Sequence, residues 1–179
     1  MKKNLFISLG ILGILIVVYL FIILSYSNFN FKMVFGKETR SLEKIDYSAN
    51  VSELDINVSS DNIVIKKSDD NEVHINYYKS NKKIFETYCN DGVLTIKQKQ
   101  PWYILFNFSK NYDIEISLPN TELNSVSIKV SSGNVNINKD FTVTDLSIRT
   151  SSGNISLEGK ANKTNINISS GSVNLKDFE

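Results

Sequence analysis

A pattern of twelve residues recurs near the C-terminus of the chain and constrains its fold more than any other feature. The copies are VSIKVSSGNVNI at 126–137, LSIRTSSGNISL at 146–157 and TNINISSGSVNL at 164–175, and a looser copy, LDINVSSDNIVI, occupies 54–65. The three late copies begin 20 and 18 residues apart. Repeats of this length are typical of structures in which each repeat adds one layer to a stack.

Within each copy, apolar and polar residues alternate, as in a strand with one buried face. One copy cannot bury such a face alone, whereas stacked copies bury a continuous core. We therefore predict an all-β fold: a parallel β-solenoid, or β-helix-like stack, of short strands. An antiparallel barrel or sandwich also fits the alternation, but the near-constant spacing favours the stack. The apolar columns that would fill its core are Val126, Leu146 and Thr164; Ile128, Ile148 and Ile166; Val130, Thr150 and Ile168; Val135, Ile155 and Val173; and Ile137, Leu157 and Leu175.

The SSG(N) corner interrupts the alternation in each late copy. Gly133, Gly153 and Gly171 are the predicted structural corners, since glycine adopts positive φ without a Cβ clash. Asp61 takes this place in the early copy, and aspartate tolerates left-handed geometry better than most residues. We expect the paired serines to hydrogen-bond the backbone of the turn and one another along the stack.

The first half of the chain is less regular. Residues 72–98 suggest antiparallel meanders with turns at 80–83 and 90–92. Terminal repeats of a stack are usually atypical, so this region is expected to cap it.

The N-terminal segment predicts a transmembrane helix. Residues 4–24 are apolar and uncharged, long enough to cross a bilayer core. A signal peptide is the alternative, but the run is longer than its usual apolar region and no A-x-A-like cleavage site follows. Lys2 and Lys3 favour a cytoplasmic N-terminus. We expect a signal anchor at 1–25, a juxtamembrane connector at 26–44 and an extracytoplasmic β-repeat domain at 45–179.

The charge balance gives no support for nucleic-acid binding. The chain has 20 Lys and Arg residues, and two of them precede the apolar run. The rest therefore carries 18 basic and 19 acidic residues, a net charge of about −1. No basic face is implied.

The stretch YDIEISLPNTELNSVSIKVSSGNVNI at 112–137 and the repeated corners after it carry a resemblance to a known family. They resemble the adhesin-like β-strand-repeat family of bacteria, whose function is unknown. That family repeats the motif L-x-I-x-x-x-S-G-x-V/I-x-I, often after a strand that ends in Leu-Pro, as at Leu118-Pro119. The resemblance covers roughly 45–179. It implies a β-coil fold and a membrane-anchored or envelope-associated protein.

The residues that usually carry catalysis or bind metals are sparse. His74 is the only histidine, and it alternates with apolar residues in a strand-like run, so we expect it to face solvent. Cys89 is the only cysteine, expected to be a small, partly buried hydrophobe or an exposed thiol that cross-links two copies. We predict no catalytic residue, no metal site and no cofactor. An envelope glycan hydrolase or lyase is the alternative, with Glu115 and Glu158 as available acids.

One aromatic segment stands apart from the repeat pattern. It spans 101–108 and includes Trp102, Tyr103, Leu105, Phe106 and Phe108. Consecutive apolar residues cannot all face inward on one strand, so the segment is either covered on both sides or exposed to a partner. These five residues are the predicted partner-binding residues. The expected function is therefore non-enzymatic and adhesin-like, with a cell-envelope protein or polymer as the partner.

Overall fold

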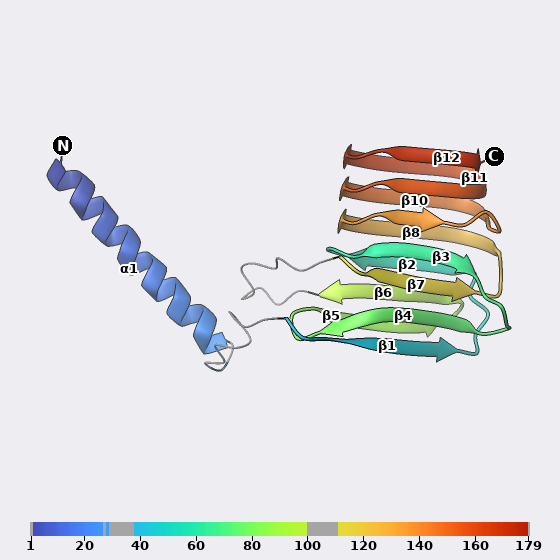
Figure 1. Ribbon diagram of the computed structural model, residues 1–179, viewed down its shortest axis with the longest axis horizontal. Helices are drawn as coiled ribbons and strands as arrows, with labels where there is room; N and C mark the ends of the chain where they lie inside the picture. Colours follow the sequence, from blue (N-terminus) through green and yellow to red (C-terminus); the bar gives the residue numbers. More distant parts are fainter. Residues whose placement is uncertain (1, 27, 29–37, 100–110, 179) are drawn as a thin grey trace.

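The computed structural model describes residues 2–26, 28, 38–99 and 111–178 (Figure 1). Helix α1 (Lys2–Tyr26) lies apart from the stacked strands. Its apolar stretch, Phe6–Tyr26, has 21 residues and is long and apolar enough to cross a membrane. A signal sequence near the N-terminus has the same properties.

The rest of the described chain is all-β. The strands are β1 (Arg40–Tyr47), β2 (Glu53–Val58), β3 (Asn62–Lys67), β4 (Val73–Ser80), β5 (Ile84–Asn90), β6 (Val93–Lys99), β7 (Asp113–Leu118), β8 (Glu122–Ser132), β9 (Val135–Ile137), β10 (Thr142–Ser152), β11 (Ile155–Ser170) and β12 (Val173–Phe178). The first strand begins at Arg40, inside the segment predicted to be a connector.

The strands form two sheets, and Figure 1 shows the order of the strands along the stack. Sheet A runs β1-β4-β7-β3-β9-β11-β12, and sheet B runs β5-β6-β2-β8-β10-β11. Strand β11 belongs to both sheets. Residues 155–157 pair with β9 in sheet A, and residues 160–170 pair with β10 in sheet B.

The pairing is mixed, so the prediction of a parallel solenoid is confirmed only in part. Strands β2, β3 and β6 to β12 pair in parallel wherever they meet one another. At the opposite end from β12, β4 pairs antiparallel with both β1 and β7, and β5 pairs antiparallel with β6.

A tight turn explains one of these antiparallel pairs. Asp91 and Gly92 connect β5 to β6, and both have positive φ, 49° and 78°. Two-residue turns of this kind reverse the chain with the twist that a hairpin needs. By contrast, β4 and β5 do not form the continuous meander predicted for 72–98, because β4 lies in sheet A and β5 in sheet B.

The core is built from the columns predicted by the repeat. In sheet B, Ile56, Ile128, Ile148 and Ile166 are consecutive partners, and in sheet A the same holds for Ile65, Ile137, Leu157 and Leu175. Members of these columns in the inner layers are at most 4% exposed. The last layer differs, since Leu175 is 51% exposed.

Candidate functional site

The predicted partner-binding residues Trp102, Tyr103, Leu105, Phe106 and Phe108 lie outside the described residues. The residues on either side of this gap are described. Lys99, at the end of β6, forms an ion pair with Glu86. Asn111 donates a hydrogen bond from Nδ2 to the carbonyl of Ser132.

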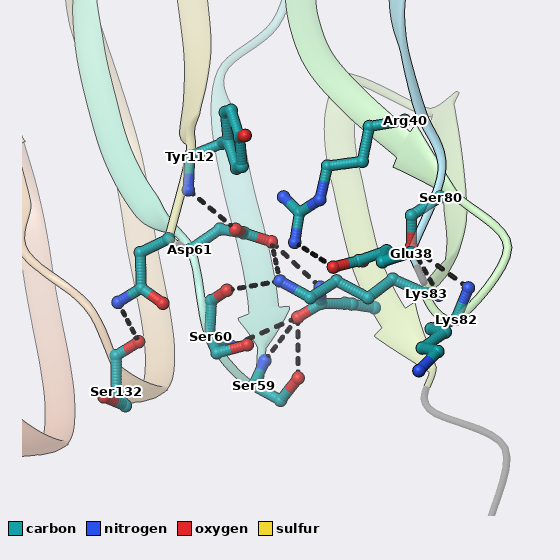
Figure 2. Close-up of polar contacts among 12 residues, drawn as sticks. Glu38, Arg40, Ser59, Ser60, Asp61, Ser80, Lys82, Lys83, Tyr112 and Ser132 are labelled. Atoms are coloured by element: carbon teal, nitrogen blue, oxygen red, sulfur yellow. Dashed lines mark hydrogen bonds and ion pairs between the residues drawn. The ribbon is translucent and has the colours of Figure 1, made fainter. Parts of the chain in front are cut away.

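A buried polar network joins the first corner to the turn between β4 and β5 (Figure 2). Lys83 Nζ lies 2.9 Å from Asp61 Oδ2, and their side chains are 0% and 4% exposed. The same ammonium donates to the carbonyl of Ser60 at 2.7 Å. Asp61 also accepts hydrogen bonds from the Tyr112 amide at Oδ1 and from Gln98 Nε2 at Oδ2. Two buried charges therefore have both a charged partner and additional hydrogen bonds, the condition under which burial is tolerated.

Gln98 extends this network to the backbone of the corner. Its Oε1 accepts hydrogen bonds from the Ser59 amide at 2.7 Å, the Ser59 hydroxyl at 2.8 Å and the Ser60 amide at 3.3 Å. The corner that has Asp61 in the place of glycine is thus held from β6 and from the β4–β5 turn. The sequence analysis assigns Asp61 to left-handed backbone geometry, which is wrong because its φ is not positive, and it assigns Lys83 only to a turn. The one signal available was the acidic residue itself, the exception at a position otherwise held by glycine.

A stack of charged and aromatic groups lies beside this network. Glu38 Oε2 and Arg40 Nη2 are 2.7 Å apart. Burial would raise the pKa of Glu38, but hydrogen bonds from Arg40 and Ser80 outweigh it and hold that pKa below its ordinary value. The Arg40 guanidinium lies 4.2 Å from the ring centre of Tyr112, within cation–π range. The Tyr112 ring in turn packs against Tyr78 at a centre-to-centre distance of 4.7 Å.

His74 joins three segments at the outer face of sheet A. Its Nδ1 lies 2.6 Å from Asp46 Oδ1 on β1, and its Nε2 lies 2.9 Å from Asp70 Oδ1 in the turn before β4. The hydrogen bonds with Asp46 and Asp70 raise the pKa of His74, because only the imidazolium can donate to both. The Glu72 amide and the His74 ring lower the pKa of Asp70. This pairing with two acids was not predicted from the sequence.

The three predicted corner glycines stack on one another. Gly153 and Gly171 have φ of 141° and 137°. A Cβ added to Gly153 would lie 2.0 Å from the Gly133 carbonyl oxygen, and one added to Gly171 would lie 1.8 Å from that of Gly153. At Gly133 the same contact would be with the Asp61 carbonyl oxygen, at 2.3 Å. Close approach of neighbouring layers therefore requires glycine at all three corners. The positive φ predicted for them is found at Gly153 and Gly171 but not at Gly133.

Asparagine side chains link successive corners. The Asn134 amide donates to Asn62 Oδ1, the Asn154 amide to Asn134 Oδ1, and the Ser172 amide to Asn154 Oδ1, at 2.9 to 3.1 Å. The sequence analysis had assigned this role to the paired serines. The ladder shows that the SSGN residues shape and connect the corners.

The acids considered for a glycan hydrolase lie too far apart to act as a pair. Glu115 on β7 forms an ion pair with Lys66, and Glu158 on β11 forms one with Lys176. Strands β3 and β9 separate β7 from β11 in the sheet. Three strand spacings of about 4.8 Å place the two acids roughly 14 Å apart. Paired carboxylates in glycosidases are about 5–9.5 Å apart.

One further predicted residue can be placed. Cys89 is a free thiol of intermediate exposure, packed against the core. Among the described residues, no group of three His, Cys, Asp or Glu side chains is arranged to hold a metal ion.

Comparison with protein families gives a match over most of the β region. The family model described as Toastrack DUF4097 matches residues 51–179. No curated protein is similar to the chain in sequence.

One solved structure supports the fold. The chain is similar to a "putative cell adhesion protein" from Clostridium sporogenes, with a TM-score of 0.52 and 12% identity over 80% of this chain and 100% of that one. It is also similar to a "putative adhesin" from Bacteroides fragilis, with a TM-score of 0.42 and 14% identity over 76% of this chain and 97% of that one. At 12% identity the likeness to the first of these concerns the fold alone.

Proposed function

The chain belongs to the Toastrack DUF4097 family, and we propose that it is a non-enzymatic, adhesin-like module of the cell surface. In this proposal α1 anchors the chain in the cell membrane, the β domain lies outside the cytoplasm, and the domain binds a protein or polymer of the cell envelope. Neither a nucleic acid nor a cofactor is part of the proposal.

The observation that carries the proposal is the exposure of α1. Its apolar stretch is only 6% buried, and Phe6, Ile14 and Val17 are 71%, 66% and 66% exposed. A helix that is apolar on all sides needs either a protein core or a lipid environment. The strands fill their own core with their own side chains, so lipid is the environment that suits α1. Lys2 and Lys3 favour a cytoplasmic N-terminus.

The aromatic segment at 101–108 is the proposed contact with the partner. Its flanks belong to β6 and to the start of β7, beside the Asp61–Lys83 network. Tyr112, which follows the segment closely, is fixed by its amide bond to Asp61 and by the Arg40 and Tyr78 contacts. A rigid base of this kind would limit the entropy lost when the segment binds.

The test uses the full chain in living bacterial cells. We expect it to remain in the membrane fraction after an alkaline carbonate wash, with an intact N-terminus by mass spectrometry. Protease added outside the cells should digest the β domain. Release of a chain that lacks residues 1–25, or protection of the β domain in intact cells, would contradict the proposal.

Partner binding is tested separately, by chemical crosslinking in cells. The double substitution Trp102→Ser and Phe106→Ser should abolish the crosslinked species formed by the unaltered chain. The matched control is Tyr88→Ser, which changes an exposed aromatic residue on β5. An unchanged crosslinking pattern in a folded double variant would refute the role of the segment.

A further inference from the structure

We propose that the outer face of sheet A, at its β1–β4–β7 end, binds a glycan chain built of uncharged sugar rings. This inference rests on the proposed function and names the class of envelope polymer. The residues that line the proposed site all belong to the described part of the chain, outside the 101–108 segment.

The proposed site is a groove of about 470 Å³ on the outside of the sheet. The register places its lining residues side by side, because Leu42 pairs with Tyr78, Lys44 with Asn76, and Asn76 with Glu115. The volume falls within the range of small-molecule sites, roughly 300–1,000 Å³. Residues from three strands thus form one continuous concave surface.

Two tyrosine rings give the groove its apolar part. Tyr78 is 37% exposed although it is a large aromatic residue, and Leu42 beside it is 50% exposed. Tyr112 packs against Tyr78 with the ring planes at 48°, and the Arg40 guanidinium, which pairs with Glu38, lies 4.2 Å from the centre of the Tyr112 ring. The rings are therefore fixed before any ligand arrives. Sugar rings present patches of C–H groups that pack on aromatic rings, while their hydroxyl groups point outward to polar partners.

Polar groups suited to those hydroxyls surround the tyrosines. The lining includes Asn76, whose amide both donates and accepts, together with Glu115 and Lys44. Asn111 and Asp113 also line it, and each keeps part of its hydrogen-bonding capacity beyond its bond to Ser132 or Asn62. Glu115 is neutralised by Lys66, which leaves Lys44 and Asp113 with opposite charges. Such a balance gives no attraction for a polyanion, which would need a basic surface. It favours an uncharged, hydroxyl-rich chain.

The surface beyond the groove continues in the same chemistry. The register places Asn76, Glu115, Val64, Asn136, Ser156 and Asn174 in one row across six strands. Successive strands are about 4.8 Å apart, comparable with the length of one sugar ring. Apart from Val64 and Glu115, the side chains of this row are small and polar. They would meet successive rings of a chain lying across the strands, with the tyrosines at one end.

The test measures binding of a soluble β-1,4-linked N-acetylglucosamine hexamer, and of a β-1,4-linked glucose hexamer, to the full chain in lipid nanodiscs. Isothermal titration and saturation-transfer NMR give the affinity and the sugar protons in contact. We expect Tyr78→Ala to weaken binding of at least one hexamer more than tenfold. Asn76→Ala should weaken it about threefold. Tyr88→Ala is the matched control, since Tyr88 is 41% exposed on β5 of sheet B, and it should change the affinity less than twofold.

Circular dichroism establishes that each variant is folded, and Asn76→Ala supplies an independent measurement if Tyr78→Ala unfolds the domain. Absence of binding by both hexamers at millimolar concentration would overturn the glycan site. Equal weakening by Tyr78→Ala and Tyr88→Ala would do the same. Either result leaves the proposed function standing if the chain is still retained in the membrane and crosslinked through the 101–108 segment.

Discussion

Replacing Lys83 by methionine tests how far the buried Asp61–Lys83 pair stabilises the fold. The substitution keeps an unbranched side chain in a site that is 0% exposed, but removes the ion pair at 2.9 Å and the bond to the Ser60 carbonyl. The Asp61 carboxylate then stays buried with only the Tyr112 amide and the Gln98 amide as donors. Removing one partner of a buried pair costs about 3–5 kcal/mol.

The assay is urea and thermal unfolding of the detergent-solubilised full chain, followed by circular dichroism in the strand region. For a domain of this size each kcal/mol corresponds to about 3–4 °C in melting temperature, so Lys83→Met should lower the melting temperature by roughly 9–20 °C. Lys99→Met is the control. Its ion pair with Glu86 is as short, at 2.6 Å, but the side chains are 62% and 43% exposed. Its loss should cost under about 1 kcal/mol.

A double variant separates unpaired charge from lost packing. Asp61→Asn combined with Lys83→Met removes both charges and keeps an oxygen acceptor for the Tyr112 amide. It should recover most of the stability lost in Lys83→Met, because neutral replacements of a buried pair are often close to neutral in effect. The reasoning is refuted if Lys83→Met costs less than about 1 kcal/mol, or if the double variant is as unstable as the single one.

Two further predictions concern the corner and the histidine. Gly153→Ala should lower the melting temperature sharply or prevent folding, because the added Cβ would lie 2.0 Å from the Gly133 carbonyl oxygen. The control is Gly10→Ala, whose added Cβ meets no atom within 4 Å and should leave the melting temperature unchanged. Equal melting temperatures for the two variants would contradict the close packing. The pH dependence follows from the raised pKa of His74 and the lowered pKa of Asp70. The stability from His74 is fully present below its unfolded pKa of about 6.5 and is lost as pH rises through the folded pKa. That from Asp70 is present above its unfolded pKa of about 3.9 and is lost as pH falls through the folded value. Urea midpoints are measured from pH 4 to 9 for the unaltered chain and for His74→Gln. The midpoint of the unaltered chain should exceed that of the variant most between about pH 4 and 6.5. A difference that stays constant with pH would argue against the ion pairs.

The repeat columns were predictable because they depend on local alternation and a fixed period. Ile128, Ile148 and Ile166 occur in equivalent positions of adjacent copies, so their pairing needs no knowledge of the rest of the chain. The glycine corners were found for the same reason. The close approach of Gly153 to Gly133 was not, since it depends on how tightly two layers pack.

The polar features could not be predicted from local pattern. Lys83 lies 22 residues from Asp61, and a lysine in a polar turn usually indicates an exposed side chain. Its burial follows from the placement of β4 and β5 in different sheets, which the strand pattern of 72–98 does not reveal. The same holds for Tyr78 and Tyr112, whose ring contact depends on β4 pairing with β7.

The stacked corners also govern which changes in chain length this fold tolerates. Each late layer contributes one glycine to the carbonyl contacts, and these glycines are 20 and 18 residues apart. The ladder joins Asn134, Asn154 and, in the last layer, Ser172. An insertion of one residue within a strand would turn every later side chain of that strand to the opposite face. Deletion of a complete layer would instead rejoin equivalent corners and equivalent columns. The height of the β domain should therefore vary between relatives in whole layers, with shorter insertions confined to the connections between strands.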